Sequence, residues 1–256
     1  MDEVELSNYE QQVFLASSGP FPFRIWRPQG AIAGSTTDGK SSSSVGTGFP
    51  LLLFLHGAGE RGTDNEVTLV HGAHDFAGPM VQRENPCFVV VPQCPVDDVW
   101  ASIDRTHEPT KLAAQPSPAL RSVQQLLDSL LTQLPIDPQR VYLTGLSMGG
   151  FGGWDLLMRE PDRYAAAVLI CGGADCQADQ LPKLARKPLW VFHGDQDDVV
   201  PVTRSREIVH RLRELGGSPR YTEYRGGDHD SWTATYSNPA VWEWLFAQRH
   251  GNSKGS

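Results

Sequence analysis

One serine of this chain has the neighbours that a nucleophile needs. Ser147 lies between Gly145 and Gly149, after an apolar run at 140–144 that predicts a buried strand. Residues 151–158 then have the composition of a helix, which places the serine on the turn between the two elements. Glycines two positions away on either side are expected where a strained turn brings neighbouring backbone too close for a Cβ atom. Ser147 is therefore a candidate nucleophile.

A serine hydroxyl is a poor nucleophile near neutral pH, so it needs a base, and the base needs an acid to orient it. The loop 193–201 follows one apolar run and contains three acids, Asp195, Asp197 and Asp198. His229 follows the next apolar run along the chain. Each of the three acids could reach a histidine from a turn, so the residues alone leave all three open. The order serine, acid, histidine indicates a nucleophile activated by a histidine–carboxylate pair.

Eight short apolar runs predict the strands that must position these residues, and from the third onward they are typical of strands buried on both faces. Amphipathic helices are predicted at 122–134 and 204–215, and a last helix begins at 238–239. Alternating strands and helices favour a mostly parallel sheet with helices on both faces and ligand sites at the carboxyl ends of its strands. The predicted strands are 12–16, 23–27, 51–55, 87–91, 141–144, 166–171, 189–192 and 221–224.

The length of 256 residues suits one large α/β domain, which we place at 1–250. Residues 34–48 are rich in Gly, Ser and Thr without periodicity, so they are expected to form a flexible loop between two strands of that domain. Residues 251–256 are expected to be a disordered tail.

The formal net charge of −8 argues against nucleic acid or an anionic membrane as a partner, because either would need clustered Lys and Arg. The first residues are acidic and lack the apolar core of a signal peptide, and no apolar run approaches the length of a membrane span. We therefore expect a cytoplasmic protein. The sequence carries no signal for its oligomeric state.

The four cysteines are not spaced as metal knuckles, and no phosphate-binding loop of the GxxxxGK type is present. We expect free, buried thiols, with Cys171 and Cys176 the pair that is nearest to a possible disulfide. Because no His, Cys or carboxylate cluster has the spacing of metal ligands either, we predict neither a metal site nor a cofactor.

Five segments together resemble one known family: LFLHGAGERGTDN, VVPQCP, YLTGLSMGGFGGWDL, VFHGDQDDVVP and GGDHDSW. They are similar to α/β-hydrolases of the dienelactone hydrolase and phospholipase/carboxylesterase branch, especially the esterases often labelled predicted peptidases. The resemblance spans about residues 50 to 246. It implies the α/β-hydrolase fold, with Ser147 as nucleophile, Asp197 as acid and His229 as base.

Attack on a carbonyl produces an oxyanion that needs two preplaced donors. The Met148 N–H directly follows the nucleophile, and the resemblance points to the Ala58 N–H, in the loop 56–59, as the second donor. Glu60 fits either a position in the substrate cleft or a structural role in ordering its loop, and the structural role is favoured. The possible cleft residues are Gly57, Glu60, Gln93, Trp100 and Trp232.

These features predict a serine hydrolase that cleaves carboxylic esters through an acyl-enzyme intermediate. Only residues 172–187 separate two predicted strands at the point where this fold often inserts a lid, so we expect no lid domain and a small-molecule or exposed ester as substrate. A serine peptidase of the same fold is one alternative, because the same triad cleaves amides. A non-catalytic, hydrolase-like receptor for a small ligand is the other.

Overall fold

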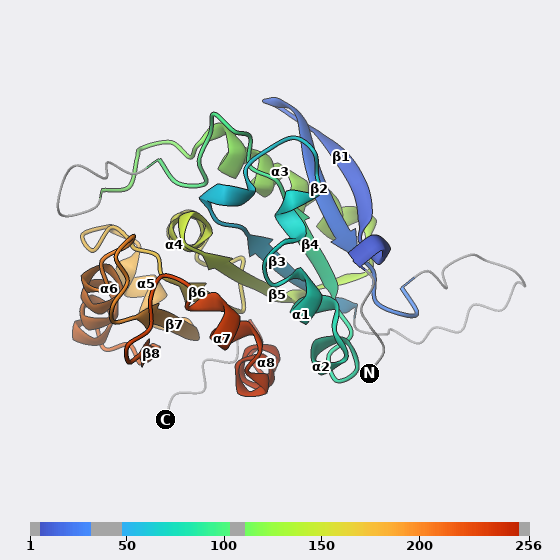
Figure 1. Ribbon diagram of the computed structural model, residues 1–256. Helices are drawn as coiled ribbons and strands as arrows, with labels where there is room; N and C mark the ends of the chain where they lie inside the picture. The colour runs from blue at the N-terminus through green and yellow to red at the C-terminus, as the bar shows by residue number, and fades with distance from the viewer. Residues whose placement is uncertain (1–5, 32–47, 103–110, 251–256) are drawn as a thin grey trace, which may run out of the picture.

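A computed structural model of the chain describes residues 6–31, 48–102 and 111–250. Its centre is an eight-stranded sheet in which each strand matches one of the eight predicted runs (Figure 1). The predicted tail, and the predicted flexible loop apart from residue 48, lie outside the described residues. The strands are β1 Glu10–Ala16, β2 Gly19–Trp26, β3 Phe49–Leu55, β4 Phe88–Pro92, β5 Ile136–Leu146, β6 Ala166–Ile170, β7 Leu189–Gly194 and β8 Arg220–Tyr224.

The sheet has the order β1-β2-β4-β3-β5-β6-β7-β8. The pairs β1–β2 and β2–β4 are antiparallel, and every later pair is parallel. The carboxyl ends of β3 and β5 to β8 therefore lie along one edge of the sheet. In a parallel sheet that edge is where loops can bring side chains from several strands together.

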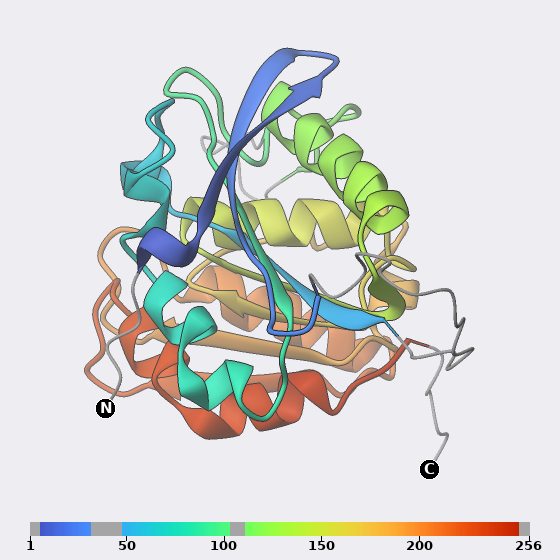
Figure 2. The same ribbon diagram turned by 90° about the vertical axis from the view of Figure 1, so that its right-hand side faces the viewer.

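Helices cover both faces of the sheet, as the apolar runs predict. Along β3, Leu51, Leu53 and Leu55 pack into one core cluster, whereas Leu52 and Phe54 pack into the other. This alternation follows from the two-residue period of a strand. One face is covered by α3 Pro118–Gln133, α4 Met148–Arg159, α5 Leu181–Leu184 and α6 Thr203–Glu214, and the other by α1 Ala73–Ala77, α2 Pro79–Gln82, α7 Trp232–Tyr236 and α8 Pro239–Phe246 (Figure 2).

Helix α3 begins four residues before its predicted start, and the cause is its N-terminal cap. The Ser117 hydroxyl accepts a hydrogen bond from the Leu120 N–H at 3.0 Å, and Pro118 occupies the first helical position. A serine cap followed by proline satisfies a free N–H and preorganises the first turn. The helix ends directly before Leu134 and Pro135, as predicted.

The chain between β6 and β7, residues 171–188, contains only the four-residue α5, so no lid domain is inserted between these strands. The short helices α1, α2, α5 and α7 have too few turns to give a periodic signal, and the sequence did not predict them. Three 3₁₀ turns, Leu6–Asn8, Ala58–Glu60 and Val67–Leu69, complete the described elements. None of the helices in the described ranges has the length and apolar character needed to cross a membrane.

Candidate active site

The candidate nucleophile lies on the turn between β5 and α4. Ser147 has a φ of 51° and a ψ of −116°, an unfavourable conformation for a residue with a side chain. Its N–H donates to the Ile170 carbonyl at 3.0 Å, and its carbonyl accepts from the Phe151 N–H at 3.1 Å. These two bonds, one to the end of β6 and one to the first turn of α4, hold the strained turn in place.

The glycines around Ser147 are required by close approach of the backbone. A Cβ atom on Gly149 would lie 1.9 Å from the Leu55 carbonyl oxygen, and one on Gly145 would lie 2.4 Å from the Gly149 carbonyl oxygen. Both distances are far below any real contact of a Cβ atom. The steric reason that the sequence suggests for these glycines therefore applies at both positions.

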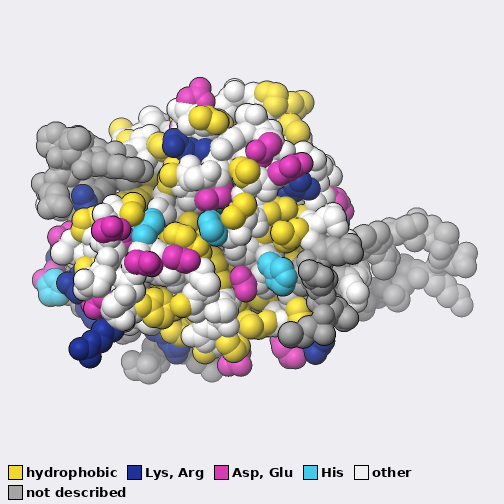
Figure 3. Space-filling model, in the orientation of Figure 1, with side chains coloured by type: hydrophobic (Ala, Val, Ile, Leu, Met, Phe, Trp, Pro, Cys, Tyr) yellow, Lys and Arg dark blue, Asp and Glu magenta, His cyan; other side chains and the backbone are white. Residues whose placement is uncertain are grey.

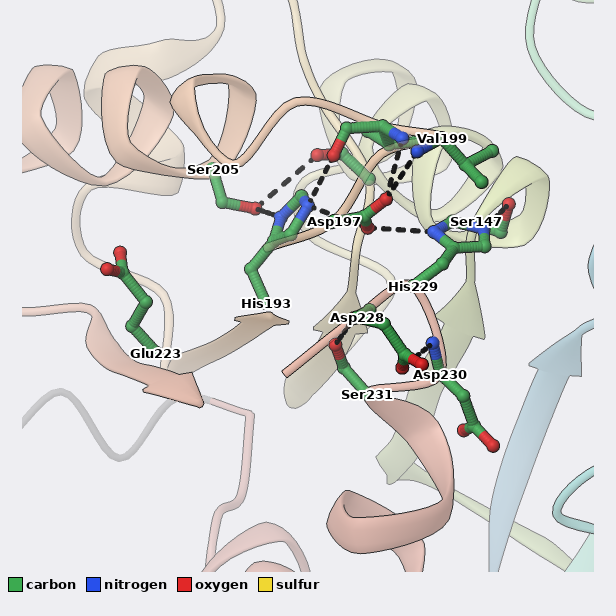
Figure 4. Close-up of polar contacts among 12 residues, drawn as sticks. Ser147, His193, Asp197, Val199, Ser205, Glu223, Asp228, His229, Asp230 and Ser231 are labelled. Carbon is green, nitrogen blue, oxygen red and sulfur yellow. Dashed lines mark hydrogen bonds and ion pairs between the residues drawn. The ribbon is translucent and has the colours of Figure 1, made fainter. Parts of the chain in front are cut away.

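Three predicted side chains converge at the carboxyl edge of the sheet (Figure 4). His229 Nε2 lies 3.0 Å from Ser147 Oγ, and His229 Nδ1 lies 2.7 Å from Asp197 Oδ2. Because a carboxylate only accepts, Nδ1 carries the ring proton and donates it to Asp197, so Nε2 is free to accept from the serine hydroxyl. This arrangement can remove the serine proton during nucleophilic attack.

The structure gives the three acids of the 193–201 loop different environments. Asp195 Oδ1 accepts from the Gly226 N–H at 2.6 Å, which joins the loop after β7 to the loop after β8. Asp198 is exposed. Asp197 is the acid that bonds His229. The sequence left open which of the three acids orients His229, and the resemblance pointed to Asp197. In the structure, Asp197 is the acid whose side chain points to His229.

The Asp197 carboxylate is completely buried, but it is well supplied with donors. Its Oδ1 accepts from the N–H groups of Val199 at 2.9 Å and Val200 at 2.8 Å. Burial by itself would raise the pKa of Asp197, but the bonds from His229, Val200 and Val199 outweigh it and hold the pKa below its usual value. Asp197 is therefore ionised throughout the neutral range.

A second histidine, His193 near the end of β7, contacts Asp197 on the side away from His229 (Figure 4). His193 is fully buried, its Nε2 donates to the Val200 carbonyl at 2.9 Å, and the same nitrogen lies 3.1 Å from Asp197 Oδ2. Burial lowers the pKa of His193 despite these two acceptors, so the ring is neutral and Nδ1 accepts from the Ser205 hydroxyl at 2.7 Å. Sequence reasoning missed Ser205, because its position on α6 gives no sign of the contact.

Two backbone N–H groups adjoin the nucleophile. Met148 is the first residue of α4, and Ala58 is the first residue of the 3₁₀ turn 58–60. The N–H groups in the first turn of a helix have no acceptor within that helix, which leaves them available to an anion. Ala58 is exposed, whereas Gly57 is buried, and a Cβ atom on Gly57 would lie 3.8 Å from Ser147 Cβ. The loop therefore passes directly beside the nucleophile.

The loop that carries Ala58 is held by a buried histidine. The Cys94 N–H donates to His56 Nε2 at 3.0 Å, so His56 Nδ1 carries the proton and donates to the Gly57 carbonyl at 2.6 Å. Burial lowers the pKa of His56 to about 4, and the ring stays neutral at physiological pH. The Trp100 indole N–H adds a bond to the His56 carbonyl at 2.9 Å. His56 is a supporting residue whose role the sequence did not reveal.

Two of the predicted cleft residues support this loop instead of lining an open cleft. Gln93 and Trp100 are both fully buried, and their polar atoms are used on backbone and loop groups. Gln93 accepts from the Asn65 N–H at 2.6 Å and donates to the Glu60 carbonyl at 3.2 Å. Their burial arises from contacts between distant loops, which local sequence patterns do not report.

The other predicted cleft residues lie beside the site. The ring of Trp232 stands 5.3 Å from that of His229 in an edge-on contact, and Trp232 is partly exposed. Glu60 is nine-tenths buried, and its Oε1 lies 3.6 Å from His71 Nε2. Gly57 contributes backbone next to Ser147.

All four cysteines are unpaired, so Cys171 and Cys176 form no disulfide. Cys171 lies at the end of β6, and its Sγ, an oxygen of Asp197 and a ring nitrogen of His229 lie within 4.8 Å of one another. Thiol, carboxylate and imidazole can together bind a soft metal, and among the described residues this is the one cluster of that kind. Two of its members already bond each other, and burial raises the pKa of the Cys171 thiol well above its usual value, which opposes metal binding.

The face of the protein drawn in Figure 3 carries little positive charge near its centre. In Figure 3, acidic side chains and histidines lie near the centre of the face drawn, whereas Lys and Arg form no continuous patch there. This distribution agrees with the formal net charge of −8. Such a face offers no electrostatic attraction to a polyanion.

A model of the phospholipase/carboxylesterase family matches residues 47–238. Poly(3-hydroxyalkanoate) depolymerase C of Paucimonas lemoignei is 29% identical over 225 residues, which cover 75% of this chain and 52% of that protein. Poly(3-hydroxyoctanoate) depolymerase of Pseudomonas fluorescens is 28% identical over 183 residues, which cover 65% of this chain and 63% of that protein. The chain thus spans less than two thirds of the length of these relatives.

Solved structures agree with the fold. The crystal structure of a thermostable esterase superposes with a TM-score of 0.82 at 38% identity, covering 95% of this chain and 64% of that chain. A ferulic acid esterase superposes with a TM-score of 0.65 at 17% identity, covering 93% of this chain and 97% of that chain. The second likeness is one of fold.

Proposed function

The chain belongs to the phospholipase/carboxylesterase family, and we propose that it is a serine esterase that cleaves carboxylic esters through a covalent acyl-enzyme. The observation that carries this proposal is the pair of contacts at His229, 3.0 Å to Ser147 Oγ and 2.7 Å to Asp197 Oδ2. Both fall within the reach of hydrogen bonds, which a general base needs.

The first half of the reaction forms the acyl-enzyme. Ser147 Oγ attacks the ester carbonyl carbon while His229 Nε2 takes the hydroxyl proton. The carbonyl oxygen becomes an oxyanion between the N–H groups of Ala58 and Met148, each worth about 3 kcal/mol to the transition state. Collapse of this intermediate breaks the bond to the alcohol, which leaves with the proton from His229.

The second half releases the acid. Water attacks the acyl-enzyme carbonyl and gives a proton to His229, and the bond to Ser147 Oγ then breaks as the proton returns to the serine. Asp197 stays ionised and stabilises the charged His229 ring, because its own pKa is held below the usual value. It takes no proton itself.

The substrate we propose is a small or exposed ester. Residues 171–188 contain only a short helix, so no inserted domain stands over the site from that side of the described chain. The two depolymerases among the relatives are named for polyesters, which supports ester bonds as the class attacked. The single sheet, covered on both faces, supports one catalytic domain over residues 1–250.

Hydrolysis of p-nitrophenyl acetate and butyrate tests the proposal. The wild type should release p-nitrophenol with a burst that matches the enzyme concentration, and Ser147→Ala should lose the burst and turnover. Ser237→Ala, the same change at an exposed serine, serves as the control. Faster cleavage of a fluorogenic peptide panel than of the esters would identify a peptidase. Ligand binding without turnover of any substrate would identify a receptor.

A further inference from the structure

A carboxylate beside the nucleophile lacks the hydrogen bonds that its burial demands. Glu60 is nine-tenths buried, and no donor in the described part of the chain bonds its Oε2. Its Oε1 lies 3.6 Å from His71 Nε2, which exceeds hydrogen-bond length. An uncompensated buried carboxylate costs several kcal/mol, so a partner outside the protein is expected to supply a donor here.

A donor lacks its acceptor in the same neighbourhood. Trp232 Nε1 is buried, and no acceptor within residues 6–31, 48–102 or 111–250 bonds it. The Trp232 ring lies 5.3 Å from the ring of His71, the residue that also contacts Glu60. His71 thus contacts both of the residues that carry an unsatisfied atom. An indole N–H left unpaired on burial is itself unfavourable.

These groups adjoin the atoms that react. A Cβ atom on Gly57 would lie 2.9 Å from Glu60 Oε2 and 3.8 Å from Ser147 Cβ, so the carboxylate and the nucleophile both adjoin Gly57. On the other side, Trp232 contacts the His229 ring edge-on at 5.3 Å. The acceptor is therefore close to Ser147, and the donor belongs to a residue that contacts the base.

We propose that Glu60 and Trp232 form a subsite for a hydroxyl group of the substrate. A hydroxyl donates one hydrogen bond and accepts others, so it can donate to Glu60 Oε2 and accept from Trp232 Nε1. The subsite rests on the proposed esterase function and narrows it to esters with a free hydroxyl near the scissile carbonyl. His71, whose side chain is 32% exposed, contacts both residues and would have to move aside for the hydroxyl to enter.

The two unsatisfied groups distinguish a hydroxyl from an ammonium group. An ammonium would pair with Glu60, but it has no lone pair and would leave the indole N–H of Trp232 without an acceptor. A plain alkyl group would leave both groups unsatisfied. Sites built to bond a hydroxyl reject analogues that lack it, because the buried polar groups then stay unpaired.

A set of ethyl esters tests this with one measurement, acid release followed by titration at constant pH. Ethyl 3-hydroxybutyrate, ethyl butyrate and ethyl 3-aminobutyrate differ only in the group on the acyl chain. A fourth ester, 2-hydroxyethyl butyrate, carries the hydroxyl on the alcohol instead. For the wild type we expect kcat/KM to be about tenfold or more higher for one of the hydroxylated esters than for ethyl butyrate. The better of the two identifies the side of the ester that the subsite binds.

The variant Glu60→Gln keeps the size of the side chain and removes its charge, and Trp232→Phe keeps an aromatic ring and removes the indole N–H. Each should reduce the preference for the hydroxylated ester, measured as the ratio of its kcat/KM to that of ethyl butyrate, about tenfold. Glu66→Gln makes the same change at an exposed glutamate of the same loop and should retain the wild-type preference.

Three outcomes would overturn the subsite. The wild type could show no preference, it could prefer the amino ester, or the two variants could slow all four esters equally, as expected if the groups hold only a structural water. Failure of the wild type to cleave any ester would instead reject the proposed function. Hydrolysis of ethyl butyrate without a preference rejects the subsite alone.

Discussion

Replacing Asp197 by Asn removes one charge from the site and changes little of its shape. The carbonyl oxygen of Asn can still accept from the N–H groups of Val199 and Val200, which now bond Oδ1 at 2.9 and 2.8 Å. The amide NH₂, in place of Oδ2, would face His229 Nδ1 and His193 Nε2, at 2.7 and 3.1 Å in the wild type. Both of these nitrogens carry protons, so two acceptor contacts become donor–donor contacts.

The cost follows from what His229 must do to avoid that clash. It can move its proton to Nε2, but that nitrogen then no longer accepts the proton of Ser147, 3.0 Å away. In addition, the imidazolium formed during attack loses its carboxylate. We expect kcat/KM to fall about 10³- to 10⁴-fold, which corresponds to about 4 to 5.5 kcal/mol of transition-state stabilisation. The donor–donor contact at His193 should also lower the free energy of unfolding by about 1 to 3 kcal/mol.

Initial rates with p-nitrophenyl butyrate and urea unfolding measure the two effects separately. Asp198→Asn makes the same change at an exposed acid of the same loop and should stay within about threefold of the wild type, because exposed charges contribute little. If Asp197→Asn kept more than a tenth of the wild-type kcat/KM, the assignment of Asp197 as the orienting acid would be wrong. An equal loss in Asp198→Asn would contradict it as well.

Three other predictions concern packing, pH and thiols. Gly149→Ala should lower the free energy of unfolding, measured by urea titration, by about 3 kcal/mol or more, because the new Cβ would lie 1.9 Å from the Leu55 carbonyl oxygen. The control Gly59→Ala, whose Cβ would have no atom within 4 Å, should change the free energy of unfolding by less than about 1 kcal/mol. Burial raises the pKa of Asp155 to about 6 despite the neighbouring Arg159. Because this pKa is higher in the folded than in the unfolded chain, the protonated carboxyl stabilises the fold fully below about pH 4, and that contribution is lost as the pH rises through 6. In urea unfolding, the wild type should lose about 3 kcal/mol over this pH range, and Asp155→Asn should not. With the aromatic disulfide reagent DTNB, native protein should react at Cys176 alone, since Cys87, Cys94 and Cys171 are buried; rapid reaction of all four thiols would contradict this packing.

The strands could be predicted because each contains a short apolar run. Strands β3 to β7 are buried along most of their length, whereas the expectation of burial on both faces was wrong for β8, which is partly exposed at the edge of the sheet. The turn at Ser147 could be predicted for a similar reason, since Gly145 and Gly149 mark a close approach of backbone that local sequence can signal. The start of α3 was predicted late, because Ser117 and Pro118 cap the helix without belonging to its apolar pattern. Features that depend on residues close together in the sequence, such as the strands and the turn at Ser147, could therefore be predicted.

The remainder of the site depends on contacts between loops that are distant in the sequence. Gln93 and Trp100 follow a buried strand, as cleft residues do, but the 56–65 loop folds over them and uses their polar atoms. The unsatisfied atoms of Glu60 and Trp232 also have no sequence signature, because a missing partner is a property of the packed structure. The sequence of one segment therefore cannot predict which polar atoms lack a hydrogen-bond partner after the whole chain has folded.

The histidines around Ser147 show the same distinction in terms of protons. Both ring nitrogens of His56 and of His193 bond groups within the protein, and burial lowers the pKa of each ring, so neither is available to take a proton. His229 differs because one nitrogen faces Asp197 and the other faces Ser147 Oγ. His56 and His229 follow strands and His193 lies near the end of β7, so all three are near the carboxyl edge of the sheet and their hydrogen bonds distinguish them. The two neutral rings hold the 56–59 loop and Asp197 in place, and among these three histidines only His229 can take the proton of Ser147.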